Sequence, residues 1–363
     1  MTVTLLWLQL AGAAAIILVA SHFLARSADV IAVKTGLGRA FIGVVLLSTA
    51  TSLPELGTGV GAIALFGEPD LAAGDAFGSN LFNLLIIGLL DLFWRNGPIL
   101  NSVGVTSAIV GALGIAVISL AAIALLVHGM TSTMSTWYVS PITIVTFIVF
   151  LFAMYLIYRV EHPSDQRADP AGAGEAQLSD PDAPGPTLVR VLETEGGEHE
   201  YAAASLSRAA VTYIIVAFFV VGAAIWLAAT GDKIATAMGW EASFVGTQFL
   251  AFSTSLPELA ASFAAIRINA PELAITGLLG SNLFNMGFIL FMDDLAFTEG
   301  ALWANVSSIH PLTAFIAVLM TSVVIFAVVS RGRRRPHAYW TTEALLLIGL
   351  YLAASFLVFF LTK

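Results

Sequence analysis

The sequence contains no cysteine in its 363 residues. That absence excludes disulfide bonds, thiolate metal sites and cysteine nucleophiles. Charged side chains are also scarce, at 11% of the chain compared with about 25% in ordinary soluble domains. Lys and Arg number only 15, against 24 Asp and Glu. The chain therefore offers no basic surface to phosphates, and we expect no nucleic-acid partner.

Signature motifs of several other protein classes are missing as well. The sequence has no P-loop pattern, which argues against a primary ion pump. It also has no HExxH, GxSxG or GxGD pattern that would supply a metal pair or a nucleophile at membrane depth. We therefore expect neither an enzyme nor a bound cofactor.

What the sequence does contain is mostly apolar, with 58% hydrophobic residues and a mean hydropathy of +0.91. Crossing a hydrocarbon core of ~30 Å takes roughly 20 helical residues. Ten apolar runs are long enough, at 4–25, 38–66, 70–91, 103–128, 136–158, 208–230, 240–266, 271–293, 307–330 and 339–361. The predicted fold class is an all-α integral membrane protein with ten transmembrane helices.

The positions of Lys and Arg predict the orientation of these spans, because loops rich in these residues stay on the cytoplasmic side. If the N-terminus is outside, 13 of the 15 Lys and Arg fall in cytoplasmic loops. Only Lys233 and Lys363 then lie outside. We therefore expect a multi-pass protein whose two termini are both external.

The one long polar stretch, 161–205, holds ten Asp and Glu, two Arg and five of the 13 prolines. It therefore carries −8 of the net charge of −9. Such a segment buries too little apolar surface to offset its ordering entropy. We predict a flexible acidic cytoplasmic linker over 161–207, between a first five-helix unit at 1–160 and a second at 208–363.

An internal repeat is the strongest signal in the sequence. TSLPEL occurs at 51–56 and 254–259, and GSNLFN occurs at 78–83 and 280–285, so the offsets are 203 and 202. Asp91 and Asp293 also match at offset 202. Because an odd number of spans separates the copies, the second must be inserted upside down relative to the first. We predict two inverted-topology five-helix repeats, with a substrate site near the bilayer midplane where they meet.

Glu55 and Glu258 lie well inside predicted spans. A carboxylate at that depth costs roughly 2.5–3.5 kcal/mol on insertion scales, so each is a functional candidate. Helical spacing places Thr51 and Ser52 on the face of Glu55. The second copy repeats this arrangement with Thr254, Ser255 and Glu258.

Two further features of the repeat add oxygen atoms. Pro54 and Pro257 cannot donate a backbone hydrogen bond and push against the preceding turn. We expect this to free main-chain oxygens near Ala50–Thr51 and Ser253–Thr254. In the GSNLFN motif, residues four apart share a helix face. These residues are the pairs Ser79 with Asn83 and Ser281 with Asn285.

Three other polar residues receive lesser roles. Asn80 and Asn282 point away from the face of the motif, so we expect them to form hydrogen bonds between helices. Asp75 lies four residues before Ser79, but its counterpart in the second copy is Gly277. We interpret Asp75 as a residue at the start of its helix rather than a direct ligand.

The chemistry of these donors favours a hard cation. Two carboxylates, freed carbonyls, hydroxyls and amides supply only oxygen, and neither motif contains His. Ca²⁺ takes six to eight oxygen ligands, whereas Mg²⁺ dehydrates reluctantly. Two Glu charges neutralise one divalent ion. Na⁺ can use the hydroxyl and amide oxygens beside them, so exchange of Na⁺ for Ca²⁺ through overlapping sites is chemically reasonable.

The paired TSLPE and GSNxxN motifs, ten spans and inverted repeat resemble the cation/Ca²⁺ exchanger superfamily, specifically its prokaryotic Na⁺/Ca²⁺ exchanger branch. The resemblance implies that Glu55 and Glu258 bind Ca²⁺ with oxygens from Thr51 and Thr254. It implies a Na⁺ ligand set that contains Ser52, Ser79, Ser255, Ser281 and the carbonyl near Ala251, with Asn83 and Asn285 at the centre. It also implies that the first and sixth spans slide over the other eight.

The chain departs from the family pattern at two places. Ala50 and Ser253 stand where Gly usually precedes the TS pair, and Asn285 stands where well-studied Na⁺/Ca²⁺ members often carry Asp.

We expect a secondary active antiporter that exchanges Ca²⁺ for Na⁺ across a prokaryotic plasma (inner) membrane. H⁺-coupled transport of Ca²⁺ or another divalent cation is the alternative, and a channel is a further one. The expected partners are these ions and the lipid bilayer, and a monomer is expected to be functional.

Overall fold

The structure is a computed structural model that describes residues 2–35, 49–131, 137–161, 205–267, 269–330 and 341–362. Within these ranges every regular element is a helix, which confirms the all-helical fold class. Eight helices or helix runs are long and apolar enough to cross a membrane. They are α1 (Val3–Thr35), α4 (Pro69–Phe93), α5 (Val105–Met130), α6 (Pro141–Glu161), α9 (Leu206–Met238), α13 to α14 (Pro271–Ala296), α15 (His310–Val329) and α16 (Thr342–Leu361).

The helices that carry the TSLPE motifs are interrupted. In the first copy α3 (Leu53–Gly61) continues into the π-helix η1 (Ala62–Phe66). The second copy runs through α10 (Ala242–Val245), the π-helix η3 (Gly246–Leu250), α11 (Ala251–Thr254) and α12 (Leu256–Arg267), with a bend of 42° between α11 and α12. The start of the predicted span 38–66 and nearly all of the predicted linker 161–207 lie outside the described residues.

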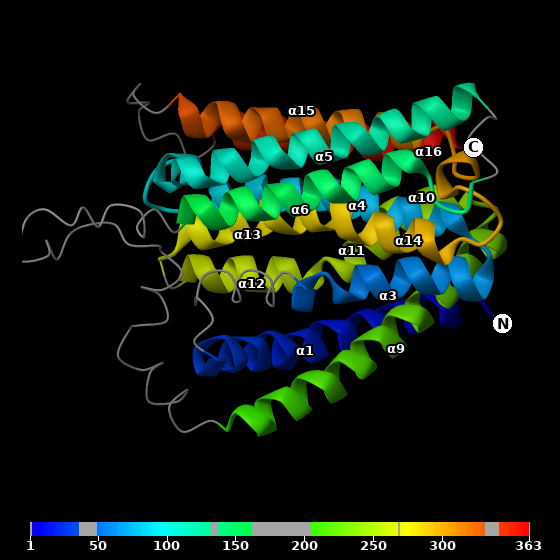
Figure 1. Ribbon diagram of the computed structural model, residues 1–363, viewed down its shortest axis with the longest axis horizontal. Helices are drawn as coiled ribbons and strands as arrows, with labels where there is room; N and C mark the ends of the chain where they lie inside the picture. The colour runs from blue at the N-terminus through cyan, green and yellow to red at the C-terminus, as the bar shows by residue number, and fades with distance from the viewer. Residues whose placement is uncertain are drawn as a thin grey trace, which may run out of the picture.

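The helices form a bundle with α1 and α9 packed together along one side of it (Figure 1). Both have 33 residues, which at 1.5 Å per residue is about 50 Å of helix. The predicted spans 4–25 and 208–230 were therefore too short, because the helices continue past the apolar runs. α1 begins and α16 ends at the same end of the bundle (Figure 1).

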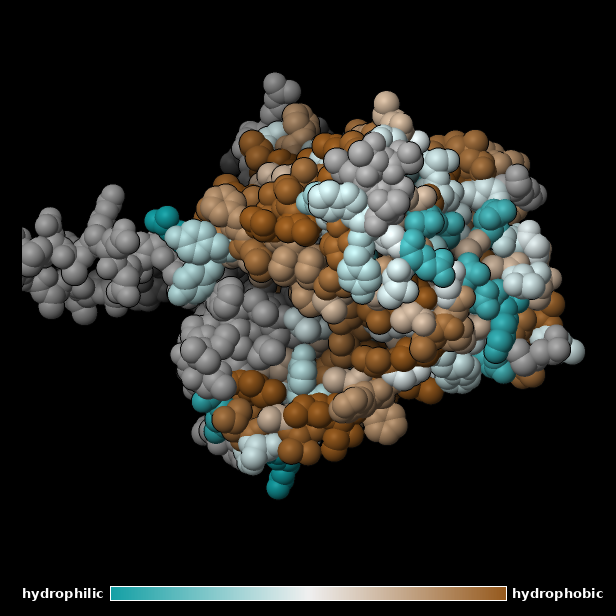
Figure 2. Space-filling view, turned by 45° about the vertical axis from the view of Figure 1, so that its right-hand side comes forward, coloured by the Kyte–Doolittle hydropathy of each residue, from teal (hydrophilic) through white to brown (hydrophobic). Residues whose placement is uncertain are grey.

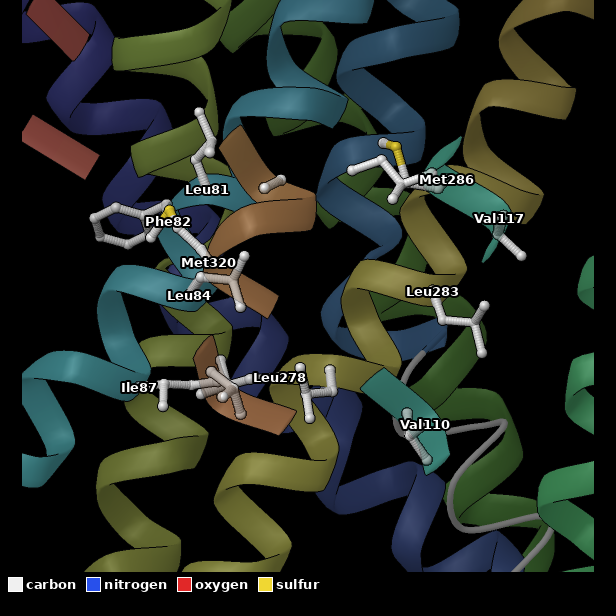
Figure 3. Close-up of a cluster of buried hydrophobic side chains, with 14 of the residues drawn as sticks. Leu81, Phe82, Leu84, Ile87, Val110, Val117, Leu278, Leu283, Met286 and Met320 are labelled. Atoms are coloured by element: carbon white, nitrogen blue, oxygen red, sulfur yellow. The ribbon is translucent and has the colours of Figure 1, made fainter. Parts of the chain in front are cut away.

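α4 is the central helix and is buried along almost its whole length. Its apolar side chains pack with those of α5, α13, the π-helix η4 (Asn285–Ile289) and α15 (Figure 3). On the outside, large apolar side chains of α1, α6, α9, α15 and α16 are exposed. Hydrophobic side chains accordingly cover much of the described surface in Figure 2. This arrangement suits a chain surrounded by lipid.

Polar contacts between the two copies come in matched pairs. Asp70, in the first turn of α4, accepts a hydrogen bond from the backbone N–H of Ser307 at 2.6 Å. Glu272, in the first turn of α13, accepts one from the backbone N–H of Gly104 at 3.0 Å. Each carboxylate therefore fixes the segment that precedes a long helix of the other copy.

A second matched pair corrects the sequence alignment. Asp91 accepts a hydrogen bond from the N–H of Ile99 at 2.7 Å. In the second copy Asp294, not Asp293, makes the corresponding bond, with the N–H of Leu302 at 2.8 Å. The second copy therefore has one residue more than the first between the GSNLFN motif and these acids, which changes the offset from 202 to 203. The π-helix η4 starts at the end of that motif, and its wider turns accommodate the additional residue.

The other offset change has the same cause. Gly67 and Asn269, which precede α4 and α13, both adopt a left-handed conformation with φ of 67° and 61°. They are related by offset 202, so the additional residue of the first copy lies between Glu55 and Gly67. That interval contains η1, whereas α12 is a regular α-helix at the corresponding place. Each one-residue difference between the copies is thus absorbed by a π-helix.

The π-helix η3 packs closely against α4 through a glycine. A Cβ atom on Gly246 would lie 2.6 Å from the carbonyl oxygen of Leu71 and 3.0 Å from the Cα of Gly74. These are backbone atoms, which cannot move aside as a flexible side chain would. The absence of a side chain at Gly246 is therefore what lets the two helices approach.

We expect Gly246→Ala to lower the free energy of unfolding by about 1–3 kcal/mol or more, because overpacking forces the helices apart. The measurement is the melting temperature of the detergent-purified protein. Gly277→Ala is the matched control, because a Cβ there would meet no atom within 4 Å. Equal melting temperatures for the two variants would contradict this account of the contact.

Candidate ion-binding site

Both TSLPE motifs break their helices at the same residue. Ser52 has φ −92° and ψ 7°, and Ser255 has φ −86° and ψ 8°. In each case a proline follows two residues later, in the first turn of the next helix segment. The breaks direct the Thr, Ser and Glu side chains of each motif into the interior of the bundle, where all are buried.

The carboxylate of Glu55 is surrounded by hydroxyl groups from both copies. Ser255 donates a hydrogen bond to Oε1 of Glu55 at 3.2 Å, and Ser79 donates a longer one to the same atom at 3.4 Å. The hydroxyl oxygens of Ser79 and Thr254 are also 3.4 Å apart. Oε2 of Glu55 is buried without a hydrogen-bond partner.

Glu258 has the mirrored environment. Its carboxylate faces the hydroxyls of Thr51, Ser52 and Ser281. Neither of its carboxylate oxygens has a hydrogen-bond partner at ordinary geometry. Glu258 also lies close enough to Glu55 for the two carboxylates to repel each other. The structure therefore brings the predicted residues of the two TSLPE motifs to one place.

The asparagines join the two GSNLFN motifs. Asn83 donates to the side-chain oxygen of Asn282 at 2.9 Å, and Asn285 donates to that of Asn80 at 3.5 Å. Asn282 also donates to the backbone carbonyl of Asn80 at 3.2 Å. The predicted role of Asn80 and Asn282 in interhelical hydrogen bonds is confirmed. The side-chain oxygens of Asn83 and Asn285 are left without partners.

Buried oxygens without a donor are thus concentrated among the predicted ligands. There are six such atoms, namely Oγ of Ser52, Oε2 of Glu55, Oδ1 of Asn83, both carboxylate oxygens of Glu258 and Oδ1 of Asn285. Leaving a buried polar atom unpaired costs about 1–3 kcal/mol, and more where it is charged. Three of the six belong to the two glutamates, and six hard oxygens reach the lower end of the coordination number of Ca²⁺.

The predicted carbonyl ligand is already engaged. The carbonyl oxygen of Ala251 accepts the N–H of Ser255 at 3.1 Å and lies 3.3 Å from the hydroxyl oxygen of Thr254. Thr254 also contacts the carbonyl of Leu250 at 3.1 Å. The N–H of Ser255 therefore already occupies one of the acceptor positions of the Ala251 carbonyl.

Asp75 was wrongly interpreted from the sequence as a residue at the start of its helix. α4 begins at Pro69, so Asp75 lies in its second turn, and it is buried. Its carboxylate accepts hydrogen bonds from Thr58 and from Thr254, the latter at 2.9 Å. Asp75 is therefore linked directly to a residue of the predicted site.

Sequence reasoning assigned no role to Thr58 or Asp293, and the structure places both beside Asp75. Thr58 follows Glu55 by three residues, so it lies one helical turn further along α3. That spacing was a usable signal. Asp293 is fully buried on α14, and both of its carboxylate oxygens lack hydrogen-bond partners. In the sequence Asp293 aligns with Asp91, whereas in the structure Asp294 makes the hydrogen bond that corresponds to that of Asp91. The sequence alignment therefore gave no reason to consider Asp293 separately.

Glu68 lies just before α4, outside the helices long enough to span the membrane, and near the carboxylates of Asp70 and Asp232. Burial raises the pKa of Glu68, and the neighbouring carboxylates of Asp232 and Asp70 raise it further. Within the described part of the chain, no three Asp, Glu, His or Cys residues come together as a metal cluster.

Comparison with known proteins places this geometry in context. The sequence model of the family described as sodium/calcium exchanger protein matches residues 5–156 and 208–361. Inner membrane protein YrbG of Escherichia coli (strain K12) is 26% identical over 332 residues, which is 86% of this chain and 84% of that protein. The putative antiporter CaxA of Alkalimonas amylolytica is 41% identical over 73 residues, 20% of this chain and 23% of that protein.

Two solved structures share the fold. The sodium-calcium exchanger NCX_Mj, soaked with 10 mM Na⁺ and zero Ca²⁺, superimposes with a TM-score of 0.58 at 18% identity, and the match covers 97% of this chain and 98% of that one. Native YfkE superimposes with a TM-score of 0.63 at 16% identity, over 97% and 92% of the two chains. At such identities the likeness establishes the fold alone.

We expect Glu258→Gln to raise the stability of the cation-free protein at pH 8 by about 1–3 kcal/mol. The substitution replaces an uncompensated buried carboxylate with a neutral amide, whose N–H groups can donate hydrogen bonds to the surrounding hydroxyl oxygens. The measurement is the melting temperature in Na⁺-free buffer with a chelator. Asp294→Ala is the contrasting control and should lower the melting temperature, because it leaves the N–H groups of Ser140 and Leu302 unpaired. A lower melting temperature for Glu258→Gln would show that the carboxylate stabilises the fold.

Proposed function

Because the chain belongs to the sodium/calcium exchanger protein family, we propose that it is a secondary active antiporter that exchanges Ca²⁺ for Na⁺ across the membrane. The observation that carries the proposal is the set of six unpaired, buried oxygens around Glu55 and Glu258. A protein that only needed to fold would pair or remove these atoms. A transported cation supplies the missing positive charge.

In this proposal the two glutamates bind Ca²⁺ and neutralise its charge. Thr51 and Thr254 contribute further oxygens to the same ion. Na⁺ occupies overlapping positions among the remaining ligands, which are Ser52, Ser79, Ser255, Ser281 and the Ala251 carbonyl, with Asn83 and Asn285 at the centre. Because Na⁺ ligands such as Ser79 and Ser255 lie directly on the Glu55 carboxylate, Na⁺ at the centre depends on the same negative charge as Ca²⁺. The two ions therefore compete, and each promotes release of the other.

Alternating access follows from ten spans arranged as two inverted five-helix repeats, 1–160 and 208–363. Supporting this arrangement, α3 and α12 run from the middle of the bundle toward opposite ends (Figure 1). The equal backbone angles at Ser52 and Ser255 also support it. α1 and α9 pack mainly on each other, so the pair can slide over the remaining helices and expose the site to either side.

The coupling ion is proposed to be Na⁺, with H⁺ as the alternative. The description of the matching family and the abundance of hydroxyl oxygens at the site favour Na⁺. H⁺ coupling is favoured by one feature, the neutral Asn285 beside two glutamates that lack a counter-charge. A channel is disfavoured, because the site residues are fully enclosed by protein.

We propose a location in a prokaryotic plasma membrane, with both termini external and 161–207 cytoplasmic. The similarity to a protein named as an inner membrane protein supports the location. The distribution of Lys and Arg supports the orientation. The position of both chain ends at one end of the bundle agrees with an even number of spans (Figure 1).

Transport is tested in proteoliposomes loaded with Na⁺ and diluted into Na⁺-free buffer that contains radioactive Ca²⁺. The wild type is expected to accumulate Ca²⁺. Glu55→Gln and Glu258→Gln are expected to reduce Ca²⁺ affinity by roughly 10–100-fold, because each removes a charged ligand. Glu299→Gln, a change at an exposed acid outside the site, should transport like the wild type.

The outcomes of this assay separate the alternatives. Ca²⁺ uptake driven by a pH gradient in Na⁺-free buffer, with no uptake driven by Na⁺, identifies H⁺ as the coupling ion. A folded wild type that transports no divalent cation with either gradient contradicts the antiporter proposal. Currents that exceed carrier turnover identify a channel.

The orientation is tested with single cysteines, since the natural chain has none. Glu299→Cys and Asn101→Cys both place a thiol at an exposed loop position. We expect a membrane-impermeant maleimide to label Glu299→Cys from outside the cell and Asn101→Cys only after the membrane is opened. The reverse pattern would invert the proposed topology.

A further inference from the structure

A second pair of carboxylates lies beside the central site. Asp75 of α4 and Asp293 of α14 flank the same turn of α3, at Thr58 and Gly59. Thr58 donates its hydroxyl hydrogen bond to Asp75. On the other side, the carboxylate of Asp293 occupies the space beside Gly59, where a Cβ atom would lie 2.5 Å from Oδ1. Asp75 and Asp293 also lie close enough to repel each other.

Asp293 differs from the acids that hold the fold together. Its neighbour Asp294 accepts backbone N–H groups on both oxygens, at 2.8 Å and 3.0 Å. Asp91 likewise uses both oxygens, for Ile99 and Thr341. Asp293 is fully buried and has no hydrogen-bond partner on either oxygen. A carboxylate in that state is costly at membrane depth, so its retention points to a ligand.

The pair is connected to the central site by one hydroxyl. Thr254 donates to Asp75 at 2.9 Å, and its hydroxyl oxygen is 3.4 Å from that of Ser79, which in turn contacts Glu55. A cation bound between Asp75 and Asp293 would compete with Thr254 for the Asp75 carboxylate. The Thr254 hydroxyl would then be free to turn toward the central site. The two places can thus be coupled through a single rotatable group.

We propose that Asp75, Asp293 and the Thr58 hydroxyl form an auxiliary Na⁺ site that works with the central one. This inference rests on the proposed exchange function. Ca²⁺ is disfavoured, because it needs six to eight oxygens and this pair offers fewer. A proton shared by these two acids is the competing occupant, and the melting assay below distinguishes it from Na⁺. The auxiliary site supplies negative charge that Asn285 does not provide at the centre.

Direct binding is tested by Na⁺-dependent melting of the purified protein, with choline replacing Na⁺ at constant ionic strength, since a cation that binds only the folded state raises the melting temperature. The background is the Glu55→Gln/Glu258→Gln double variant, whose central site is disabled. We expect this background to retain a Na⁺-dependent rise. Adding Asp293→Asn should abolish that rise, and adding Gly59→Ala should reduce it by displacing the carboxylate. Adding Asp294→Asn, a matched loss of a buried charge, should leave it.

A transport readout complements the melting assay. In otherwise wild-type protein, Asp293→Asn is expected to raise the Na⁺ concentration for half-maximal Ca²⁺ exchange by about tenfold or more while Ca²⁺ affinity stays unchanged. Unchanged Na⁺ dependence in this variant would overturn the inference.

The remaining outcomes separate this inference from the proposed function. If the wild type responds to Na⁺ and the double variant does not, Na⁺ binds only at the centre; the exchange function stands and the auxiliary site is wrong. If acidification stabilises the double variant and Na⁺ does not, the pair takes a proton and the Na⁺ assignment is wrong. If the wild type responds to neither Na⁺ nor Ca²⁺, the proposed function itself fails.

Discussion

The structure depends on one electrostatic constraint, the burial of carboxylates beside which the described residues place no positive charge. Glu55 and Glu258 face each other across the centre of the bundle with hydroxyls and amides around them and several oxygens unpaired. Low dielectric makes such a group expensive and makes its attraction for a cation correspondingly strong. The helix breaks at Ser52 and Ser255 lie beside these glutamates and turn oxygen atoms toward them. The fold thus holds its ligands in a state that only an ion relieves.

Four other acids help hold the surrounding helices in place through hydrogen bonds to the backbone. Asp70, Asp91, Glu272 and Asp294 each accept backbone N–H groups at helix and loop junctions. These acids lie near helix ends, whereas Glu55 and Glu258, which have unpaired oxygens, lie at the centre of the bundle; Asp293 is unpaired although it directly precedes Asp294. The same residue type therefore serves two purposes, and the presence or absence of a donor distinguishes them.

Much of this arrangement could be predicted from the sequence. Composition and apolar runs gave the helical membrane fold, and the spacing within TSLPE and GSNLFN placed Thr51, Ser79 and their counterparts around the glutamates. Asp75 was misread although the predicted span 70–91 starts only one residue after α4 does. Its partners, Thr58 and Thr254, lie on other helices and are not visible in the local pattern around Asp75. The pairing of Asp91 with Asp293 failed because a π-helix adds one residue without any signature in composition. Contacts such as Thr254 with Asp75 join residues far apart in the chain, and no local pattern reports them.

The reciprocal asparagine bonds have a consequence for how such a chain can change over time. Asn83 of the first copy bonds Asn282 of the second, and Asn285 of the second bonds Asn80 of the first. A substitution of one of these asparagines therefore removes a hydrogen-bond partner in the other half. The two halves cannot change independently at these positions after duplication. Positions outside these shared bonds, such as Asp75 and its counterpart Gly277, can differ between the halves. We expect residues that give the two halves different roles to lie at such positions.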